Sequence, residues 1–493
     1  MIKAFAISGA LVIGAGLVSS CSTAHADAAD AVDGGKCQAA VGAAGLGVSD
    51  ATAKWVEPVG AVPAYCEITG TLSPEAGSTI GVVYRLPTGW NGKMLGLGGG
   101  GWAGNVTLQA AMPGLTAHYA IAQTDGGHAS AAAFENAWVT QEPKAKDFSW
   151  RAIHEMTVKG KALVAAYYGR KHQHALFQGC STGGRMALME AQRFPADYDA
   201  IIAGAPVYML VTQTSAVLRN NLFAQPGAAL GADGAKSASE ATLAACDAKD
   251  GVTDGVIADP RACRVDPASI PGLSAAQAGA LRTAYDGARA ADGSWAQWPL
   301  SRGGEAGWGQ FVAINGDRKE FSNGGGFGGL LPVVFPGKTV DMNALTPAQV
   351  VEARQSAFAQ MYEAKDPNLA PFFKRGGKLL LWHGESDPGP SPVGTIDYAE
   401  AVKKAAPGGA AKGMRMFLAP GVNHCGGGPG ADQLPLLETL DQWLTTGKAP
   451  ETLVARKADN SKVRLLCAWP RVAQYGGSGD VNDPKNYRCI ARS

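Results

Sequence analysis

Short apolar runs alternate with segments of helical periodicity between residues 93 and 206. The apolar runs are bounded by glycine or polar residues, which predicts strands within 93–97, 119–128, 174–179 and 198–206. Between them, 150–169 places apolar residues at helical spacing and 185–194 has the pattern of a helix that Pro195 ends. This alternation predicts an α/β protein with a doubly wound, mostly parallel sheet.

The alternation stops after residue 206 and resumes with the apolar run in 376–387. The intervening segment contains scattered tryptophans and a glycine tract, without a regular period. We therefore predict an α/β core that is interrupted by a large inserted lid, with the core formed by 27–206 and 371–493 and the lid by 207–370.

Composition narrows the classes of partner. The chain has 493 residues, of which 17% are charged, and its formal net charge is +1. A near-neutral chain without basic runs argues against nucleic acid or an anionic membrane surface as the partner. A small-molecule substrate is the simpler expectation.

The N-terminus has the pattern of an export signal, predicted to span 1–26. Lys3 precedes the apolar stretch 4–18, which is too short to span a bilayer comfortably. Two processing sites compete: a lipobox ending at Cys21, which would lipidate that cysteine, and ordinary cleavage after Ala24–Ala26. No later segment has the length and apolarity of a membrane span, so we expect an exported protein, soluble or tethered by lipid.

The cysteine count fits an oxidising compartment. Nine cysteines less Cys21 leave eight, an even number that allows 105 pairings. Proximity in the sequence suggests three bridges, which leaves Cys180 and Cys425 as partners by elimination: Cys37–Cys66, Cys246–Cys263 and Cys467–Cys489.

The stretch GCSTGG at 179–184 matches the pattern G-x-S-x-G. It follows a predicted strand and precedes a predicted helix, which is the setting of a nucleophile elbow, although two glycines around a serine also suit a plain tight turn. In the elbow interpretation Ser181 is the nucleophile, and the N–H of Thr182 faces the developing oxyanion.

A serine nucleophile needs a base and an orienting acid, which this type of fold supplies in the order Ser, Asp, His. His424 follows the last predicted strand and Asp387 ends the strand before it. The glycine-rich loop 96–104 suits the second oxyanion N–H, and it lacks the spacing of a nucleotide-binding loop. The other histidines of the mature chain are interpreted as structural: His118, His128, His154, His172, His174 and His383.

A second chemical signal is the acidic stretch CDAKDGVTDGV at 246–256. Asp247, Asp250 and Asp254 fall close together, and carboxylates at that spacing repel one another unless a cation neutralises them. Oxygen ligands of this type suit calcium, although the spacing is not that of an EF-hand. A solvated acidic turn is the alternative.

Together, GCSTGGRMALMEAQRFPADYDAIIAGAP, LLLWHGESDP, DYAEAV and PGVNHCGGGPG resemble the tannase and feruloyl esterase family, from about Cys37 to the C-terminus. The resemblance implies an α/β-hydrolase fold with Ser181, His424 and Asp387 as the catalytic triad. It implies oxyanion N–H groups from Gly101 and Thr182, and a structural Ca²⁺ in the lid. The calcium ligands would be the side chains of Asp247, Asp250 and Asp254 and the carbonyls of Val252 and Val256. The resemblance also implies a Cys180–Cys425 disulfide.

These features predict an exported serine carboxylesterase that cleaves esters of aromatic acids of the hydroxycinnamic or gallic type. An esterase for terephthalate monoesters, which the same resemblance includes, is an alternative. Such relatives have an aromatic residue shortly after the catalytic acid, where this chain has Pro390. They also bind the free carboxylate with a lid arginine, with which neither Arg302 nor Arg318 aligns. A peptidase or amidase on the same fold and a catalytically inactive surface binding module are the remaining alternatives.

Overall fold

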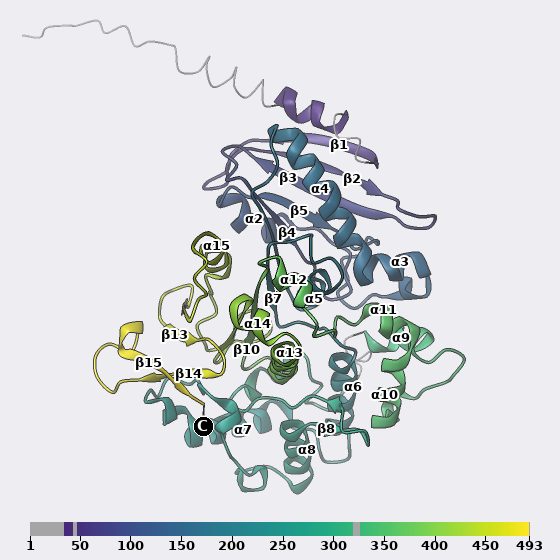
Figure 1. Ribbon diagram of the computed structural model, residues 1–493. Coiled ribbons are helices and arrows are strands. Elements are labelled where there is room, and N and C mark those ends of the chain that lie inside the picture. Colours follow the sequence, from purple (N-terminus) through teal and green to yellow (C-terminus); the bar gives the residue numbers. More distant parts are fainter. Residues whose placement is uncertain (1–33, 43–46, 319–325, 493) are drawn as a thin grey trace, which may run out of the picture.

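The computed structural model describes residues 34–42, 47–318 and 326–492 (Figure 1). The predicted signal peptide and Cys21 lie outside this range. Within it, no helix has the length and apolarity that a membrane crossing requires.

One nine-stranded sheet organises the core, in the order β1-β2-β3-β5-β4-β6-β7-β10-β11. The strands from β5 to β11 run parallel to one another, and β1, β2 and β3 extend one end as an antiparallel ribbon. The predicted mostly parallel sheet is therefore confirmed. The strands are β1 Val48–Val56, β2 Tyr65–Leu72, β3 Ile80–Pro87, β4 Lys93–Leu97, β5 Ala120–Thr124, β6 His174–Cys180, β7 Ala200–Gly204, β10 Lys378–Gly384 and β11 Met414–Ala419.

The parallel strands bury both of their faces, which is why their sequences are continuous apolar runs. Along β10, Leu379 and Leu381 pack into one apolar cluster, whereas Leu380 packs into the other. Helices cover both faces, as Figure 1 shows for α2 and α4. The first cluster includes residues of α4 Ala152–Tyr168, and the second includes residues of α2 Leu108–Thr116 and α15 Leu436–Thr446. The other core helices are α3 Glu142–Lys146, α5 Thr182–Arg193, α13 Pro392–Ala405 and α14 Pro407–Gly413.

Helix α5 begins earlier than its sequence pattern suggests. The expected start was residue 185, but the helix begins at Thr182 and includes Gly183 and Gly184. A Cβ on Gly183 would lie 2.7 Å from the carbonyl oxygen of Gly99, and one on Gly184 would lie 2.3 Å from that of Gly204. The two glycines therefore let the first turn of α5 pack against neighbouring backbone. This packing involves segments distant in the sequence, so a local pattern does not reveal it.

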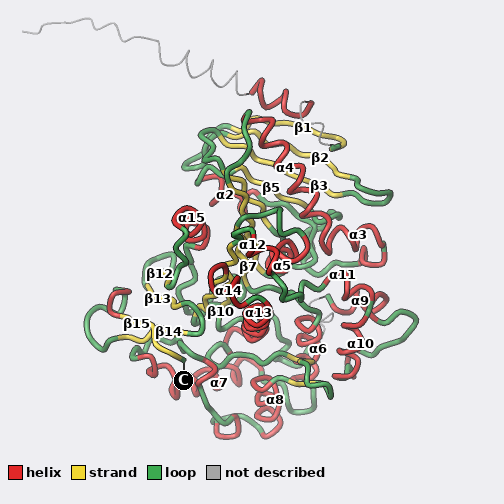
Figure 2. The backbone as a smooth tube through the Cα atoms, in the orientation of Figure 1, coloured by secondary structure: helices red, strands yellow, loops and turns green. Residues whose placement is uncertain are grey.

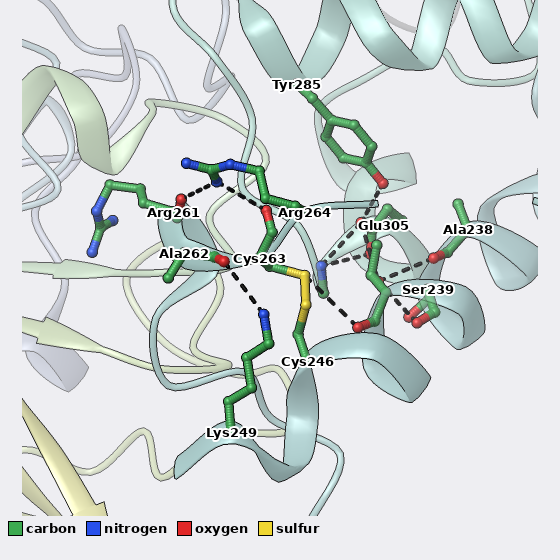
Figure 3. The surroundings of a disulfide bond; sticks show 12 residues. Ala238, Ser239, Cys246, Lys249, Arg261, Ala262, Cys263, Arg264, Tyr285 and Glu305 are labelled. Atoms are coloured by element: carbon green, nitrogen blue, oxygen red, sulfur yellow. Dashed lines mark hydrogen bonds between the residues drawn. A yellow bond between two sulfur atoms is a disulfide. The ribbon is translucent and has the colours of Figure 1, made fainter. Parts of the chain in front are cut away.

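The inserted segment gathers its helices at one end of the molecule, below the sheet in Figure 1. Part of it has an apolar cluster of its own around Trp308. The buried Glu305 carboxylate accepts hydrogen bonds from Tyr285 and Thr242 near the Cys246–Cys263 bridge (Figure 3). The boundaries of the lid at 207 and 370 remain a prediction. The helices and strands of this segment are α6 Val211–Phe223, α7 Gly231–Cys246, α8 Ala275–Asp286, β8 Ala288–Arg289, β9 Trp295–Gln297, α9 Phe327–Val334, α10 Pro347–Gln355 and α11 Ala357–Tyr362. Helix α12 Ala370–Lys374 begins at the predicted boundary and leads into the core.

Two antiparallel hairpins, not anticipated from the sequence, follow α15 and lie beside the lid (Figure 2). They are formed by β12 Thr452–Arg456 with β13 Val463–Cys467, and by β14 Arg471–Tyr475 with β15 Tyr487–Ala491. The Cys467–Cys489 disulfide joins the two hairpins. The structure contains the four disulfides that the order of the cysteines suggested.

Candidate active site

Ser181 lies in the sharp turn between β6 and α5. Its backbone has φ 64° and ψ −125°, a conformation that costs a non-glycine residue about 1–3 kcal/mol. Backbone hydrogen bonds hold the turn: Ser181 N–H donates to the carbonyl of Gly204, and the Ser181 carbonyl accepts from Arg185 and Val207. The surrounding sheet and helix therefore enforce the strained position of the serine.

Ser181, His424 and Asp387 form one continuous hydrogen-bonded chain. His424 Nε2 lies 2.9 Å from Ser181 Oγ, and His424 Nδ1 lies 2.7 Å from Asp387 Oδ2. Since an ionised carboxylate only accepts, Nδ1 carries the proton and Nε2 is free to accept from the serine hydroxyl. The three residues follow β6, β11 and β10, at the carboxyl edge of the parallel strands, where ligands of such sheets bind.

The environment of Asp387 keeps it ionised. Burial by itself raises the pKa of the Asp387 carboxyl, but the positive charge that His424 carries when protonated and hydrogen bonds from His383 and His424 outweigh burial and lower it to about 2. The N–H of Gly389 donates to the other carboxylate oxygen, Oδ1, at 2.8 Å. The carboxylate is thus fixed and charged at neutral pH, as an orienting acid must be.

His383 is a second histidine on the same carboxylate, which the sequence interpretation had treated as structural. Its Nε2 lies 3.1 Å from Asp387 Oδ2 and 3.1 Å from the carbonyl of Pro390, and its Nδ1 lies 2.7 Å from Thr395 Oγ1. Because a carbonyl and a carboxylate both accept, Nε2 is the protonated nitrogen of His383. The side chain is fully buried, so His383 orients the Asp387 carboxylate from inside the protein, without contact with the cavity.

Arg219 on α6 fastens the inserted segment to the loop that follows Asp387. Its guanidinium donates to the carbonyls of Gly389 at 2.8 Å and Pro388 at 3.3 Å, and to that of Trp298 at 2.8 Å. Burial lowers the pKa of Arg219 to about 9, and the charge of Asp387 opposes this shift. An arginine inside a helical pattern carries no sequence signal for such a contact.

A cavity opens at Ser181 and His424. Its aromatic walls include Trp102 and Phe134, and Phe311 of the inserted segment meets the His424 ring edge-on at a centroid distance of 5.1 Å. The other lining residues are Gly101, Thr182, Val207, Thr212, Gln213, Ala216, Gly389 and Pro390. A largely apolar cavity beside Ser181 suits an aromatic ligand.

Both predicted oxyanion residues line this cavity. Thr182 is the first residue of α5, where backbone N–H groups have no acceptor within the helix. Gly101 has φ +59°, and a Cβ there would lie 2.5 Å from the carbonyl oxygen of Ala133. His128 holds the same loop, since its Nε2 lies 2.7 Å from the carbonyl oxygen of Trp102. The loop conformation therefore requires glycine at position 101.

The Cys180–Cys425 disulfide joins the neighbours of the serine and the histidine. Its two Cα atoms are 6.0 Å apart, and the cysteines are 245 positions apart in the sequence. Cys425 adopts a positive φ of 60°, so the loop after His424 is as tightly shaped as the serine turn. A covalent bond thus connects the two loops that carry the hydrogen bond from Ser181 to His424.

The acidic loop lies away from the cavity, against the C-terminal hairpins. Both carboxylate oxygens of Asp247 accept backbone hydrogen bonds, from Asp254 and Gly255, and Asp250 accepts from Val252. The Asp254 carboxylate pairs with Lys462 and Arg464. Across 34–42, 47–318 and 326–492, no three or more His, Cys, Asp or Glu side chains are grouped as a metal site. The loop is therefore well ordered by its own hydrogen bonds and ion pairs.

Known proteins resemble this chain over most of its length. The chain is 32% identical to the mono(2-hydroxyethyl) terephthalate hydrolase of Piscinibacter sakaiensis, with 87% of this chain and 85% of the relative covered. It is 31% identical to a probable feruloyl esterase of Arthroderma benhamiae, with 86% of this chain and 85% of the relative covered.

Solved structures share the fold. An esterase from Aspergillus oryzae superimposes with a TM-score of 0.80 at 24% identity, covering 93% of this chain and 100% of that structure. Feruloyl esterase B from the same organism gives a TM-score of 0.78 at 24% identity, covering 92% of this chain and 100% of that structure. The family model described as tannase and feruloyl esterase matches residues 66–283 and 285–490. The chain therefore belongs to the tannase and feruloyl esterase family.

Proposed function

We propose that this protein hydrolyses esters of aromatic acids through an acyl-enzyme on Ser181. The observation that carries the proposal is the hydrogen-bonded chain from Ser181 through His424 to Asp387, which opens on an aromatic cavity. The membership of the family supports the ester substrate, and relatives at 31% and 32% identity have names that specify esters of aromatic acids.

The geometry supports a two-step reaction. Ser181 Oγ attacks the ester carbonyl while His424 Nε2 takes its proton, and the Asp387 carboxylate stabilises the imidazolium that forms. The N–H groups of Gly101 and Thr182 stabilise the oxyanion, at about 3 kcal/mol for each donor. His424 then protonates the leaving alcohol and activates the water that releases the acid.

Similarity to a terephthalate monoester hydrolase supports the alternative substrate, whereas the residues that line the cavity do not. A terephthalate monoester carries a free carboxylate, and burying it requires a cation or several donors. The described residues that line the cavity include no lysine or arginine. Arg302 is not among them, and its guanidinium packs over the Tyr285 ring at 4.3 Å. We therefore propose uncharged aromatic acyl groups as the preferred substrates.

Labelling with a fluorophosphonate tests the nucleophile. We expect one phosphonyl group per chain, located by peptide mass spectrometry on the peptide that contains Ser181, and no label on the Ser181→Ala variant. Failure to label the folded wild type would favour an inactive binding module.

In the same preparation, feruloyl, galloyl and terephthaloyl monoesters are compared by kcat/KM with peptide substrates, and faster cleavage of the peptides would favour a peptidase.

We also propose that the protein is exported, from the signal-like pattern at 1–26 and the four disulfides. Intact mass of the mature chain from the native host distinguishes the two processing sites. Cleavage after Ala26 leaves an unmodified chain that begins at Asp27, whereas lipidation adds acyl mass to a chain that begins at Cys21.

Calcium in the loop 247–256 is a separate proposal. Its support is the spacing of Asp247, Asp250 and Asp254, their position beside the Cys246–Cys263 bridge, and the resemblance to the family's loop. The side chains of these aspartates and the carbonyls of Val252 and Val256 would hold the ion. Calcium would stabilise the fold there, since the loop does not line the catalytic cavity.

Thermal unfolding tests this calcium site. Adding calcium after EGTA treatment is expected to raise Tm by at least about 2 °C, because an ion that binds only the folded state stabilises it. Asp247→Asn is expected to lose this response. Asp292→Asn is the matched control, because Asp292 lies in another turn of the inserted segment and accepts only from Ser294. Equal Tm values in calcium and EGTA would contradict the proposal.

A further inference from the structure

Two uncharged polar side chains of the cavity wall, Thr212 and Gln213, form what we call its polar corner. Among the described lining residues, Thr212 and Gln213 are neutral polar side chains outside the catalytic and oxyanion groups, and they are neighbours on α6. The walls around them are apolar or aromatic, including Trp102, Phe134 and Phe311. A bound aromatic acid could therefore contact apolar walls and also hydrogen-bond to these two side chains.

Gln213 is buried without a full set of hydrogen bonds. Its side chain is 5% exposed, and its Oε1 has no hydrogen-bond partner. The Tyr362 hydroxyl also has no hydrogen-bond partner. Burial raises the pKa of this hydroxyl, and the nearby Gln213 amide opposes the shift. An unpartnered buried polar atom has a free-energy cost. Such a cost at the wall of a catalytic cavity points to a partner that arrives with the substrate.

The neighbours of Gln213 hold it in place. The Tyr362 ring stacks on Trp102 at 5.2 Å, and the buried Arg185 guanidinium lies over the Tyr362 ring at 4.2 Å. Arg185 is itself fixed by the carbonyls of Ser149, Phe148 and Tyr362. The polar corner is therefore built on a rigid aromatic stack, so it selects among ligands better than a loose side chain would.

The chemistry of a carboxamide selects the ligand. The oxygen and nitrogen of a glutamine amide exchange places when the group turns, so the side chain presents an acceptor or a donor. A ring hydroxyl both donates and accepts and satisfies Gln213 in either orientation. A carboxylate only accepts, and it would bring an unpaired charge into a corner where no described lining side chain is a lysine or arginine.

We infer that Gln213 is a specificity-determining residue that hydrogen-bonds a hydroxyl group on the aromatic ring of the acid, with Thr212 beside it. The inference rests on the proposed function and specifies its acyl group. It selects hydroxylated aromatic acids over acids that carry a second carboxylate.

The experiment uses matched methyl esters of cinnamic acid that differ only at the ring 4-position: hydroxyl, hydrogen, methoxy and carboxylate. We expect the wild type to prefer the hydroxyl ester over the unsubstituted ester by about tenfold or more in kcat/KM, and to disfavour the carboxylate ester. In Gln213→Met, which keeps the length of the side chain, the hydroxyl-to-hydrogen ratio is expected to fall to about 2 or less. In Gln213→Glu, the carboxylate ester is expected to lose a further tenfold or more, by like-charge repulsion.

Binding provides a readout that does not depend on turnover. Calorimetry of the 4-hydroxy ester with Ser181→Ala is expected to give a Kd about tenfold lower than with Ser181→Ala/Gln213→Met. Gln192→Met is the matched control, because Gln192 donates to Ala364 and Tyr398 outside the cavity. That variant is expected to keep the wild-type ratio of the hydroxyl to the hydrogen ester.

Two results would overturn the inference while the esterase proposal stands: a wild type that cleaves the carboxylate ester as fast as the hydroxyl ester, or a Gln213→Met variant with the wild-type ratio. A wild type inert toward all four esters and p-nitrophenyl acetate would overturn the proposed function itself. In that case, a Kd of the 4-hydroxy ester that is about tenfold lower for Ser181→Ala than for Ser181→Ala/Gln213→Met would still support the role of Gln213 in recognition.

Discussion

Replacement of Ser181 by alanine is expected to lower kcat/KM for methyl 4-hydroxycinnamate by about 10⁴- to 10⁶-fold. The substitution removes the oxygen that attacks the ester, whereas His424 and Asp387 keep their hydrogen bond at 2.7 Å. The folded state loses no buried apolar volume. The backbone at residue 181 still has to adopt the strained φ of 64°, so Tm is expected to stay within about 2 °C of the wild type. Steady-state kinetics and calorimetry on the same preparation measure the two effects.

Ser149→Ala is the matched control for a lost serine hydroxyl. Ser149 is buried and its Oγ has no hydrogen-bond partner, and it does not line the catalytic cavity. Its variant is expected to retain wild-type kcat/KM. Hydrolysis that survives in Ser181→Ala at more than about one hundredth of the wild-type rate would exclude Ser181 as the nucleophile.

Removal of the Cys180–Cys425 bridge is expected to reduce both stability and activity. In the Cys180→Ala/Cys425→Ala variant, the unfolded chain regains the freedom of a loop whose ends are 245 positions apart, which the chain-entropy model values at about 5 kcal/mol. The turns that carry Ser181 and His424 also lose their covalent link. Because small displacements between reacting groups are costly, kcat is expected to fall by at least about tenfold. The measurements are Tm and kcat at a temperature where the variant remains folded.

The Cys467→Ala/Cys489→Ala variant separates the two effects. Those cysteines join the C-terminal hairpins and are 22 positions apart, so their loss is expected to cost about 3 kcal/mol and to leave kcat unchanged. A Cys180→Ala/Cys425→Ala variant that is less stable but has wild-type kcat would show that the bridge serves the fold alone.

The serine turn and the alternation of strands and helices could be predicted because both depend on local patterns. Buried parallel strands are short apolar runs, and Ser181 stands between such a run and a helix. The order of the strands then indicates where Asp387 and His424 belong, since each follows a strand whose carboxyl end lies at the same edge. The helix start at Thr182 was missed because Gly183 is helical only through its packing against Gly99.

The partners of the acid and the polar corner could not be predicted, because they depend on contacts between distant segments. Arg219 stands in a helical pattern 168 positions before Asp387, and its three carbonyl acceptors come from two separate loops. His383 is a strand residue whose ring happens to face the carboxylate that follows it. Gln213 has no motif at all, and only its burial beside Tyr362 distinguishes it from other helical glutamines.

The contact between Arg219 and the loop after Asp387 has a consequence for protein engineering. A guanidinium from the inserted segment hydrogen-bonds the carbonyls of Pro388 and Gly389, so the insertion and the loop after Asp387 depend on each other for their positions. A chimera that exchanges the insertion between two relatives must therefore carry its arginine and its acid loop together. Exchanging the insertion alone would leave a buried guanidinium without its carbonyl acceptors, and the loop after Asp387 without the donor that holds it.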